Sequence, residues 1–189
     1  MFGRFCGATS SRGEPNVCDS NRSHSAHTLD DTRVPLARTV KMRFVHDDGG
    51  RAASGFRGHA GDCVARAIAI VTQRPYQQIY KELADINANM VRTERRPDAG
   101  HRSARNGVYV KHKLFKGYML IQGFRWIPCM HIGTGCKVHL RNDELPTGRL
   151  VVVVSKHYTA VIDGVIHDTH DPARGGSRCV YGYWLLHGQ

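Results

Sequence analysis

Two apolar runs separated by Asp163-Gly164 make up the segment His157-Tyr-Thr-Ala-Val-Ile-Asp-Gly-Val-Ile-His-Asp168. An Asp-Gly pair between such runs is a strong hairpin signal, because a type I′ turn needs positive φ at both central positions. In that register Ile162 faces Val165, and His157 and Asp168 lie on one face of the ribbon as diagonal neighbours, about 7–8 Å apart at the backbone. The segment therefore predicts an antiparallel hairpin that brings an imidazole and a carboxylate together.

A buried helix is predicted to begin at Cys63, because Asp62 is a good N-cap and apolar residues recur at helical spacing up to Val71. Further helices are indicated over 76–86 and 110–122. The strand candidates are 124–128, 136–140, 150–154, 157–162, 165–169 and 179–186. Helices followed by strands predict an α+β fold, with N-terminal helices packed on a C-terminal antiparallel β-sheet.

The chain divides into two parts by composition. Residues 1–41 are rich in Ser, Arg, Asn and Gly and have no hydrophobic period, so they are predicted to form a disordered or poorly ordered extension. Patterned sequence begins at Met42, and 42–189 is predicted to be the folded domain. Either Met1 or Met42 fits the pattern as the start.

The composition is that of an ordinary globular protein, with 189 residues and 41% hydrophobic content. No stretch is long and apolar enough for a membrane span, and no secretory signal is evident, so a cytoplasmic location in a bacterial or phage-infected cell is expected. The six cysteines are expected to be mostly reduced. The Cys129 and Cys136 spacing does not match a zinc site, and we expect neither a metal nor a cofactor.

The formal net charge is +11, and much of the excess lies in the basic segment 92–116. Candidate nucleic-acid-binding residues there are Arg92, Arg95, Arg96 and Arg105. A solvated loop and helix face is the commoner interpretation of such a run. Both interpretations stay open, and an acidic surface is an alternative partner.

The order Cys63, His157, Asp168 suggests thiol chemistry. The thiolate is the nucleophilic form of cysteine, and thiols at helix N-termini beside an imidazolium ionise more easily. Cys63 would be the nucleophile, His157 the base and acid, and Asp168 the group that orients the imidazole.

Each of these three residues also has a structural interpretation: an inert buried thiol, a hydrogen-bonded strand histidine and a turn carboxylate. The cluster of His167, Asp168 and His170 could also be interpreted as a metal site. Strand alternation places His167 on the other face from Asp168 and His170, which disfavours it.

These residues resemble the papain-like cysteine peptidases, in particular the compact bacterial type found as bacteriocin-processing domains of exporters. The shared features are a cysteine that opens a buried helix after Gly61-Asp62, a histidine that begins a strand, and an Asp near the following strand. The resemblance implies helices packed on an antiparallel sheet, a cleft between them, and acyl transfer through a thioester. The implied substrate is a peptide or protein, cleaved at a peptide, isopeptide or other amide bond.

One position departs from the family pattern. The family places a Gln about six residues before the cysteine to bind the oxyanion, and this chain has Arg57 there, with His59 nearby. Arg57 and His59 are therefore the candidate oxyanion residues, since loss of one donor costs about 10²–10³ in rate. The alternative is a weak or inactive papain-like fold that serves as a basic nucleic-acid, ribonucleoprotein or virion-associated binding module.

Overall fold

The computed structural model describes residues 41–91 and 100–187. These residues belong to one compact unit, Ala37–Gln189. The predicted N-terminal extension, 1–41, lies outside the described residues except for Lys41. All statements below concern the described ranges.

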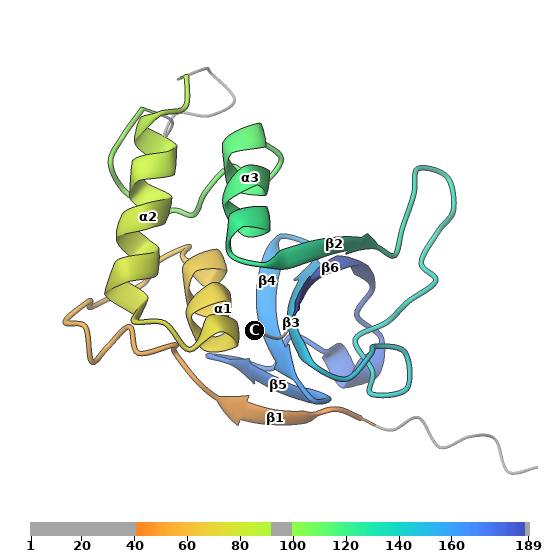
Figure 1. Cartoon of the computed structure of the whole chain (residues 1–189). Coiled ribbons are helices and arrows are strands. Elements are labelled where there is room, and N and C mark those ends of the chain that lie inside the picture. Colours follow the sequence, from red (N-terminus) through yellow and green to blue (C-terminus); the bar gives the residue numbers. More distant parts are fainter. Residues whose placement is uncertain (1–40, 92–99, 188–189) are drawn as a thin grey trace, which may run out of the picture. The chain divides into compact units, whose positions relative to one another are not determined.

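The described ranges form an α+β fold (Figure 1). The helices are α1 (Cys63–Thr72), α2 (Tyr76–Ala88) and α3 (Lys113–Ile121), with a short 3₁₀ turn at Arg174–Gly176. The strands are β1 (Arg43–His46), β2 (Phe124–Pro128), β3 (Arg149–Val154), β4 (His157–Ile162), β5 (Val165–Asp168) and β6 (Val180–Leu186). None of the described helices has the length and apolar content needed to cross a bilayer.

The six strands form one sheet in the order β1-β5-β4-β3-β6-β2. Strands β2 to β6 follow the helices, and the pairs among them are antiparallel. Strand β1 precedes the helices and pairs in parallel with β5. The prediction of a purely antiparallel, C-terminal sheet is therefore wrong at one edge. The sequence around Arg43 is too short to show alternation, and only the pairing with β5 makes it a strand.

Two apolar clusters lie on the two faces of the sheet. The first joins the helices to the sheet: Ile68 and Val71 of α1, Tyr76 and Leu83 of α2 and Phe115 of α3 pack with sheet residues that include Val151, Ala160 and Trp184. The second covers the other face, where Leu150, Val152, Val161 and Ile166 pack with Met42, Leu140 and Ala173. The long connections, rather than helices, cover this second face.

The hairpin between β4 and β5 forms as predicted. Ile162 pairs with Val165, and the turn residues Asp163 and Gly164 have φ of 47° and 76°. These values match the left-handed positions of a type I′ turn. The Asp163 carboxylate accepts a hydrogen bond from the Gly148 amide at 2.9 Å, so it supports the turn and points away from His157.

The segment 136–140 is not a strand, contrary to prediction. Only an isolated bridge, His139 with Cys179, forms there, and Cys136 is joined to Cys179 by a disulfide. The expectation that the cysteines are mostly reduced is thus wrong for this pair. Cys63 and Cys129 are the free thiols of the described ranges, and Cys6 and Cys18 lie outside them. The two bonded residues are 43 positions apart in the sequence, so no local spacing signals the bond.

Candidate active site

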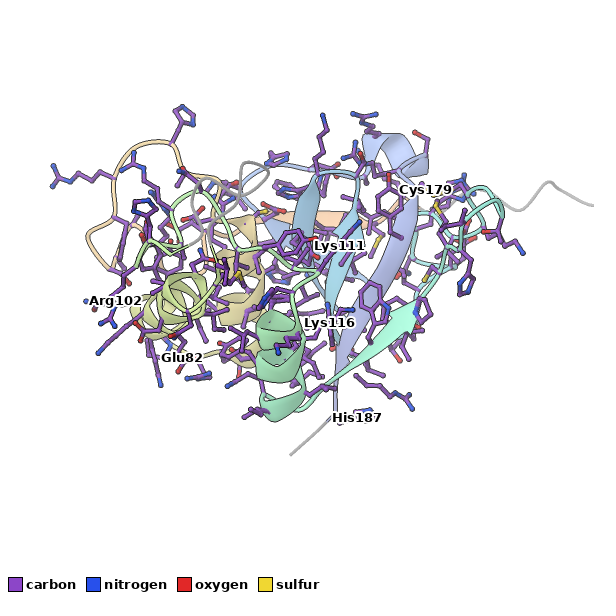
Figure 2. All side chains as sticks on the ribbon, turned by 90° about the horizontal axis from the view of Figure 1, so that it is seen from above. Glu82, Arg102, Lys111, Lys116, Cys179 and His187 are labelled. Carbon is purple, nitrogen blue, oxygen red and sulfur yellow. A yellow bond between two sulfur atoms is a disulfide. The ribbon has the colours of Figure 1, made fainter. Side chains whose placement is uncertain are left out.

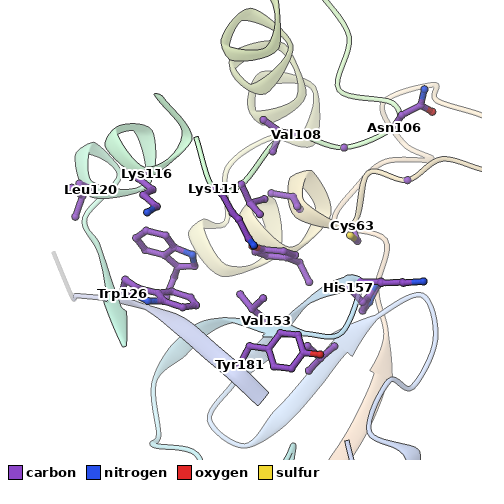
Figure 3. A pocket seen from close by; sticks show the side chains of 18 residues that line it. Cys63, Asn106, Val108, Lys111, Lys116, Leu120, Trp126, Val153, His157 and Tyr181 are labelled. Atoms are coloured by element: carbon purple, nitrogen blue, oxygen red, sulfur yellow. The ribbon is translucent and has the colours of Figure 1, made fainter. Parts of the chain in front are cut away.

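The three residues predicted to act together come from three elements that meet at one place in the fold. Cys63 is the first residue of α1, His157 the first of β4 and Asp168 the last of β5. The α1 helix packs on β4 (Figure 1). Cys63 and His157 line the same cavity (Figure 3).

His157 and Asp168 form a close, largely buried pair. The His157 Nε2 atom lies 2.6 Å from Asp168 Oδ2, and the Asp168 carboxylate is held further by the Thr169 amide, which donates to Oδ1 at 2.7 Å. Only 4% of Asp168 is exposed. The pairing fixes the plane of the imidazole and leaves Nδ1 as the ring nitrogen available to another group.

The electrostatics of the pair favour the charged form of both members. Burial opposes the charge of Asp168, but the hydrogen bond and charge of His157 outweigh it and lower the pKa of the carboxyl. Burial likewise opposes the charge of His157, but hydrogen bonding and charge from Asp168 and from Cys63 raise the pKa of the imidazole to about 9. Asp168 and Cys63 thus both favour the protonated form of the His157 ring.

The start of α1 offers backbone donors beside the thiol. The first intrahelical bond runs from the Arg66 amide to the Asp62 carbonyl, so the amides of residues 63–65 have no acceptor within the helix. Asp62 stands at the N-cap position but makes no side-chain cap bond, which corrects its predicted capping role. A helix N-terminus is a favourable place for developing negative charge.

Asp62 instead anchors the helix start in the interior. Its carboxylate is 1% exposed and accepts from Arg51 Nε at 2.7 Å and from the Tyr76 hydroxyl, and Arg66 Nε lies 3.5 Å away. Burial, with Asp62, raises the pKa of Tyr76, so the phenol stays a donor. This network fixes the residue that precedes the thiol, and no motif in the sequence predicted it.

The candidate oxyanion residues Arg57 and His59 have exposed side chains, and neither lines the cavity. Their backbone carbonyls accept bonds from the guanidinium groups of Arg51 and Arg105, at 3.3 Å and 3.2 Å. Their assignment to the oxyanion stays a prediction, and the amides at the helix start lie closer to the thiol along the chain.

The predicted nucleic-acid-binding residues are placed only in part. Arg92, Arg95 and Arg96 lie outside the described residues. Arg105 is exposed and uses its guanidinium to hold the His59 carbonyl. Two lysines of the basic segment, Lys111 and Lys116, line the cavity instead.

A metal ion would find donor atoms at one end of the site. His157, Asp168 and His170 each offer a ligand atom, and these atoms lie within 4.8 Å of one another. The rings of His157 and His170 are 4.8 Å apart. His170 is largely exposed, whereas His157 is already bonded to Asp168. The cluster thus combines one buried, bonded pair with one exposed histidine, a donor set that suits a weakly bound ion better than a structural metal.

A cavity of about 850 Å³ extends from Cys63 and His157. Its walls are mainly apolar, with Val108, Val110 and Val153 along them and Trp126, Trp184 and Leu120 at the far end. Figure 3 shows Leu120, Lys116 and Trp126 gathered at one end and Cys63 and His157 at the other, with Lys111 between them. Sequence reasoning missed these wall residues, because they come from segments that only the sheet and α3 bring together.

Comparisons with protein-family models, with curated proteins and with solved structures find no match to this chain.

Proposed function

We propose that this chain is a thiol-dependent hydrolase that cleaves a peptide, isopeptide or other amide bond through Cys63, His157 and Asp168. The observation that carries the proposal is that Cys63, at the N-terminus of α1, lines the same large cavity as His157, whose ring is bonded to the buried Asp168. A nucleophile, a base held by a third group and a space for substrate are the parts that covalent acyl transfer needs. The resemblance to papain-like peptidases agrees with this set of residues.

The steps follow from the positions of the groups. The Cys63 thiolate attacks the carbonyl carbon, and the electron pair of the C=O bond moves to the oxygen, where the amides at the start of α1 face the developing charge. Protonated His157 gives its proton to the leaving nitrogen as the C–N bond breaks, which leaves a thioester on Cys63 and releases an amine. Asp168 keeps the ring oriented by accepting its Nε2–H.

The second half returns the enzyme to its starting state. Neutral His157 takes a proton from water as the water oxygen attacks the thioester carbonyl. The C–S bond then breaks, and the carboxylic acid leaves. The Cys63 thiolate and the protonated imidazole are restored.

The first test compares the two free thiols of the described ranges. Cys129 is the matched control, because it is half-buried, burial raises its pKa, and it does not line the cavity. We expect iodoacetamide to modify Cys63 much faster than Cys129 near neutral pH, and His157→Ala to remove this difference. Equal rates at the two thiols in the wild-type chain would contradict the proposal.

The second test measures cleavage directly with a mixed peptide library and mass spectrometry. Cys63→Ala should abolish cleavage and Cys129→Ala should leave it intact. Cleavage should also persist with EDTA present. Cleavage that survives Cys63→Ala but stops with EDTA would instead assign the chemistry to a metal held by His157, Asp168 and His170.

A further inference from the structure

The cavity beyond the thiol has a chemical character of its own. Among the described residues, those that line it include three lysines, Lys111, Lys116 and Lys156, and no aspartate or glutamate. All three are exposed, and none has an ion-pair partner among the described residues. The cavity therefore presents unneutralised positive charge over apolar walls.

The three lysines come from different elements that surround the cavity. Lys111 precedes α3 and Lys116 is on α3, and both lie on the side of the sheet that the helices cover (Figure 2). Figure 3 shows the Lys111 side chain running down into the cavity and the Lys116 amine beside the indoles. Lys156 is in the turn before His157 and has a φ of 58°, a left-handed conformation that few non-glycine residues adopt. The tight turn thus holds this lysine at the rim next to the reacting group.

The far end of the cavity is an aromatic surface with a fixed shape. The Trp126 and Trp184 rings lie 5.1 Å apart, and Trp126 is 37% exposed while Trp184 is 5% exposed. Trp126 lies against the backbone of β6, since a Cβ at Gly182 would stand 2.4 Å from its ring. An apolar group from a ligand can cover Trp126 and the exposed Leu120 there.

The sheet sets the distance between the two ends. From β4, which carries His157, to β2, which carries Trp126, there are three strand spacings of about 4.8 Å, or about 14 Å. His157 pairs with Val154 on β3, whereas Trp126 aligns through Trp184 with Val151, which adds about 10 Å along the strands. The backbone separation is about 17 Å, and an extended peptide covers it with about five residues.

We propose that the cavity selects an extended, acidic protein segment with a bulky apolar residue about five positions from the bond that Cys63 attacks. The apolar side chain packs on Trp126 and Leu120, and neighbouring carboxylates pair with Lys111 and Lys116, while Lys156 binds a carboxylate near the reacting carbonyl. This inference rests on the proposed function for the position of the scissile bond.

A single-stranded nucleic acid is the other macromolecule that lysines and tryptophans can bind. Base stacking needs open ring faces, yet Trp184 is nearly buried and Trp126 is packed against Trp184 and Gly182. The valines between the lysines, Val108, Val110 and Val153, offer nothing to sugar or phosphate. The cavity therefore suits alternating apolar and acidic side chains better than a regular phosphate backbone.

The test measures binding separately from cleavage. A fluorescein-labelled peptide with Glu-Phe-Glu and a glycine spacer of about four residues is titrated into the Cys63→Ala chain and followed by fluorescence polarisation. We expect the Lys-Phe-Lys and Glu-Gly-Glu versions to bind at least about tenfold more weakly, through lost charge pairing and lost apolar contact respectively. Similar affinity for all three peptides would overturn the proposal.

Variants of the cavity sharpen the result. Lys116→Glu should invert the preference between the acidic and basic peptides. Lys113→Glu should leave that preference in place, because Lys113 is an exposed lysine of the same helix that does not line the cavity. Equal effects of the two variants would show general electrostatics and overturn the assignment. Tighter binding of a thymidine oligonucleotide, with the same dependence on Lys116, would overturn it in favour of nucleic acid.

The outcomes separate this inference from the proposed function. A peptide preference in the Cys63→Ala chain without cleavage by the wild-type chain would overturn the hydrolase and uphold the binding assignment. Cleavage of all three peptides at equal kcat/KM would uphold the hydrolase and overturn the binding assignment.

Discussion

The two ends of the cavity are built in different ways. The thiol end uses one helix start and one tight hairpin, and its charged groups are buried and hydrogen-bonded to one another. The far end uses side chains from α3, β2 and β6, and its lysine, Lys116, is exposed and has no ion-pair partner among the described residues. Groups that must hold one geometry are thus locked in the interior, and groups that meet a ligand remain at the surface.

The largest expected effect comes from replacing His157 at the thiol end. His157→Ala removes the only group in the described site that acts on both Cys63 and Asp168, so kcat/KM should fall by about 10⁴-fold or more. His170→Ala is the matched control, because its ring lies 4.8 Å from that of His157 but is largely exposed. Its loss should stay below about tenfold. Equal losses would show that the two histidines act together, as metal ligands would.

The disulfide between Cys136 and Cys179 lies outside both ends of the cavity. Cys179 precedes β6 and lies at the opposite side of the fold from α2 (Figure 2), and the bond closes a sequence separation of 43 residues. Replacing Cys136 and Cys179 by Ser should lower the free energy of unfolding by about 3–4 kcal/mol, because the unfolded chain loses a long-loop constraint. Urea unfolding measures this.

The alkylation rate of Cys63 is the control for the disulfide variant. It should change by no more than about twofold, because neither Cys136 nor Cys179 lines the cavity that holds Cys63 and His157. A large change in that rate would mean that the disulfide and the thiol site are coupled.

The hairpin and helix of the thiol end were predictable because their signals are local. Asp163-Gly164 fixes the register of β4 and β5 by turn chemistry alone, and that register places His157 near Asp168. The helical spacing after Cys63 likewise needs no distant partner to define the buried face. Local signals thus placed the candidate catalytic residues.

The rest of the fold depends on contacts between distant segments. Strand β1 exists through its pairing with β5, and the segment 136–140 has the composition of a strand but finds only one bridging partner. Asp62 is a residue type that commonly caps helices, yet its carboxylate accepts hydrogen bonds from Arg51 and Tyr76 in the interior instead. The tertiary structure decided these cases against local propensity.

The buried network at the thiol end should contribute strongly to stability. Asp62→Ala leaves Arg51 unpaired beside the core, so the free energy of unfolding should fall by about 3 kcal/mol. Arg102→Ala breaks an ion pair with Asp85 that is largely exposed, and it should cost no more than about 1 kcal/mol. Chemical denaturation of both variants measures the difference. Equal losses of unfolding free energy would mean that the Asp62 network stabilises the fold no more than an exposed ion pair does.

The pH dependence tests whether the thiol end acts as one electrostatic unit. The folded pKa of His157, about 9, lies above its ordinary value of 6.5, so the stability it contributes is fully present below pH 6.5 and is lost as the pH rises through about 9. The proposed mechanism also needs the protonated ring, so kcat/KM should fall about tenfold per pH unit above that value.

Asp168→Asn sharpens the pH test. It removes one of the groups that raise the pKa of His157, so the alkaline limb should move to lower pH. Lys156→Ala, which changes a neighbouring exposed charge, should move it much less. An alkaline limb that stays in place in Asp168→Asn would show that another group controls it.

The smallest effect should come from a single methyl group at the far end. In Gly182→Ala the new Cβ would stand 2.4 Å from the Trp126 ring and 2.8 Å from the Ile127 carbonyl oxygen, so the indole must move away from β6. We expect the ratio of the Glu-Phe-Glu affinity to the Glu-Gly-Glu affinity to fall about tenfold, because the apolar surface loses its shape. The rate of Cys63 alkylation should remain that of the wild-type chain, since the displaced Trp126 ring packs on Trp184 and Gly182 rather than on the thiol end. If the alkylation rate falls together with the peptide preference, the two ends are mechanically joined through β3 and β6, and the contrast between a locked end and an open end no longer holds.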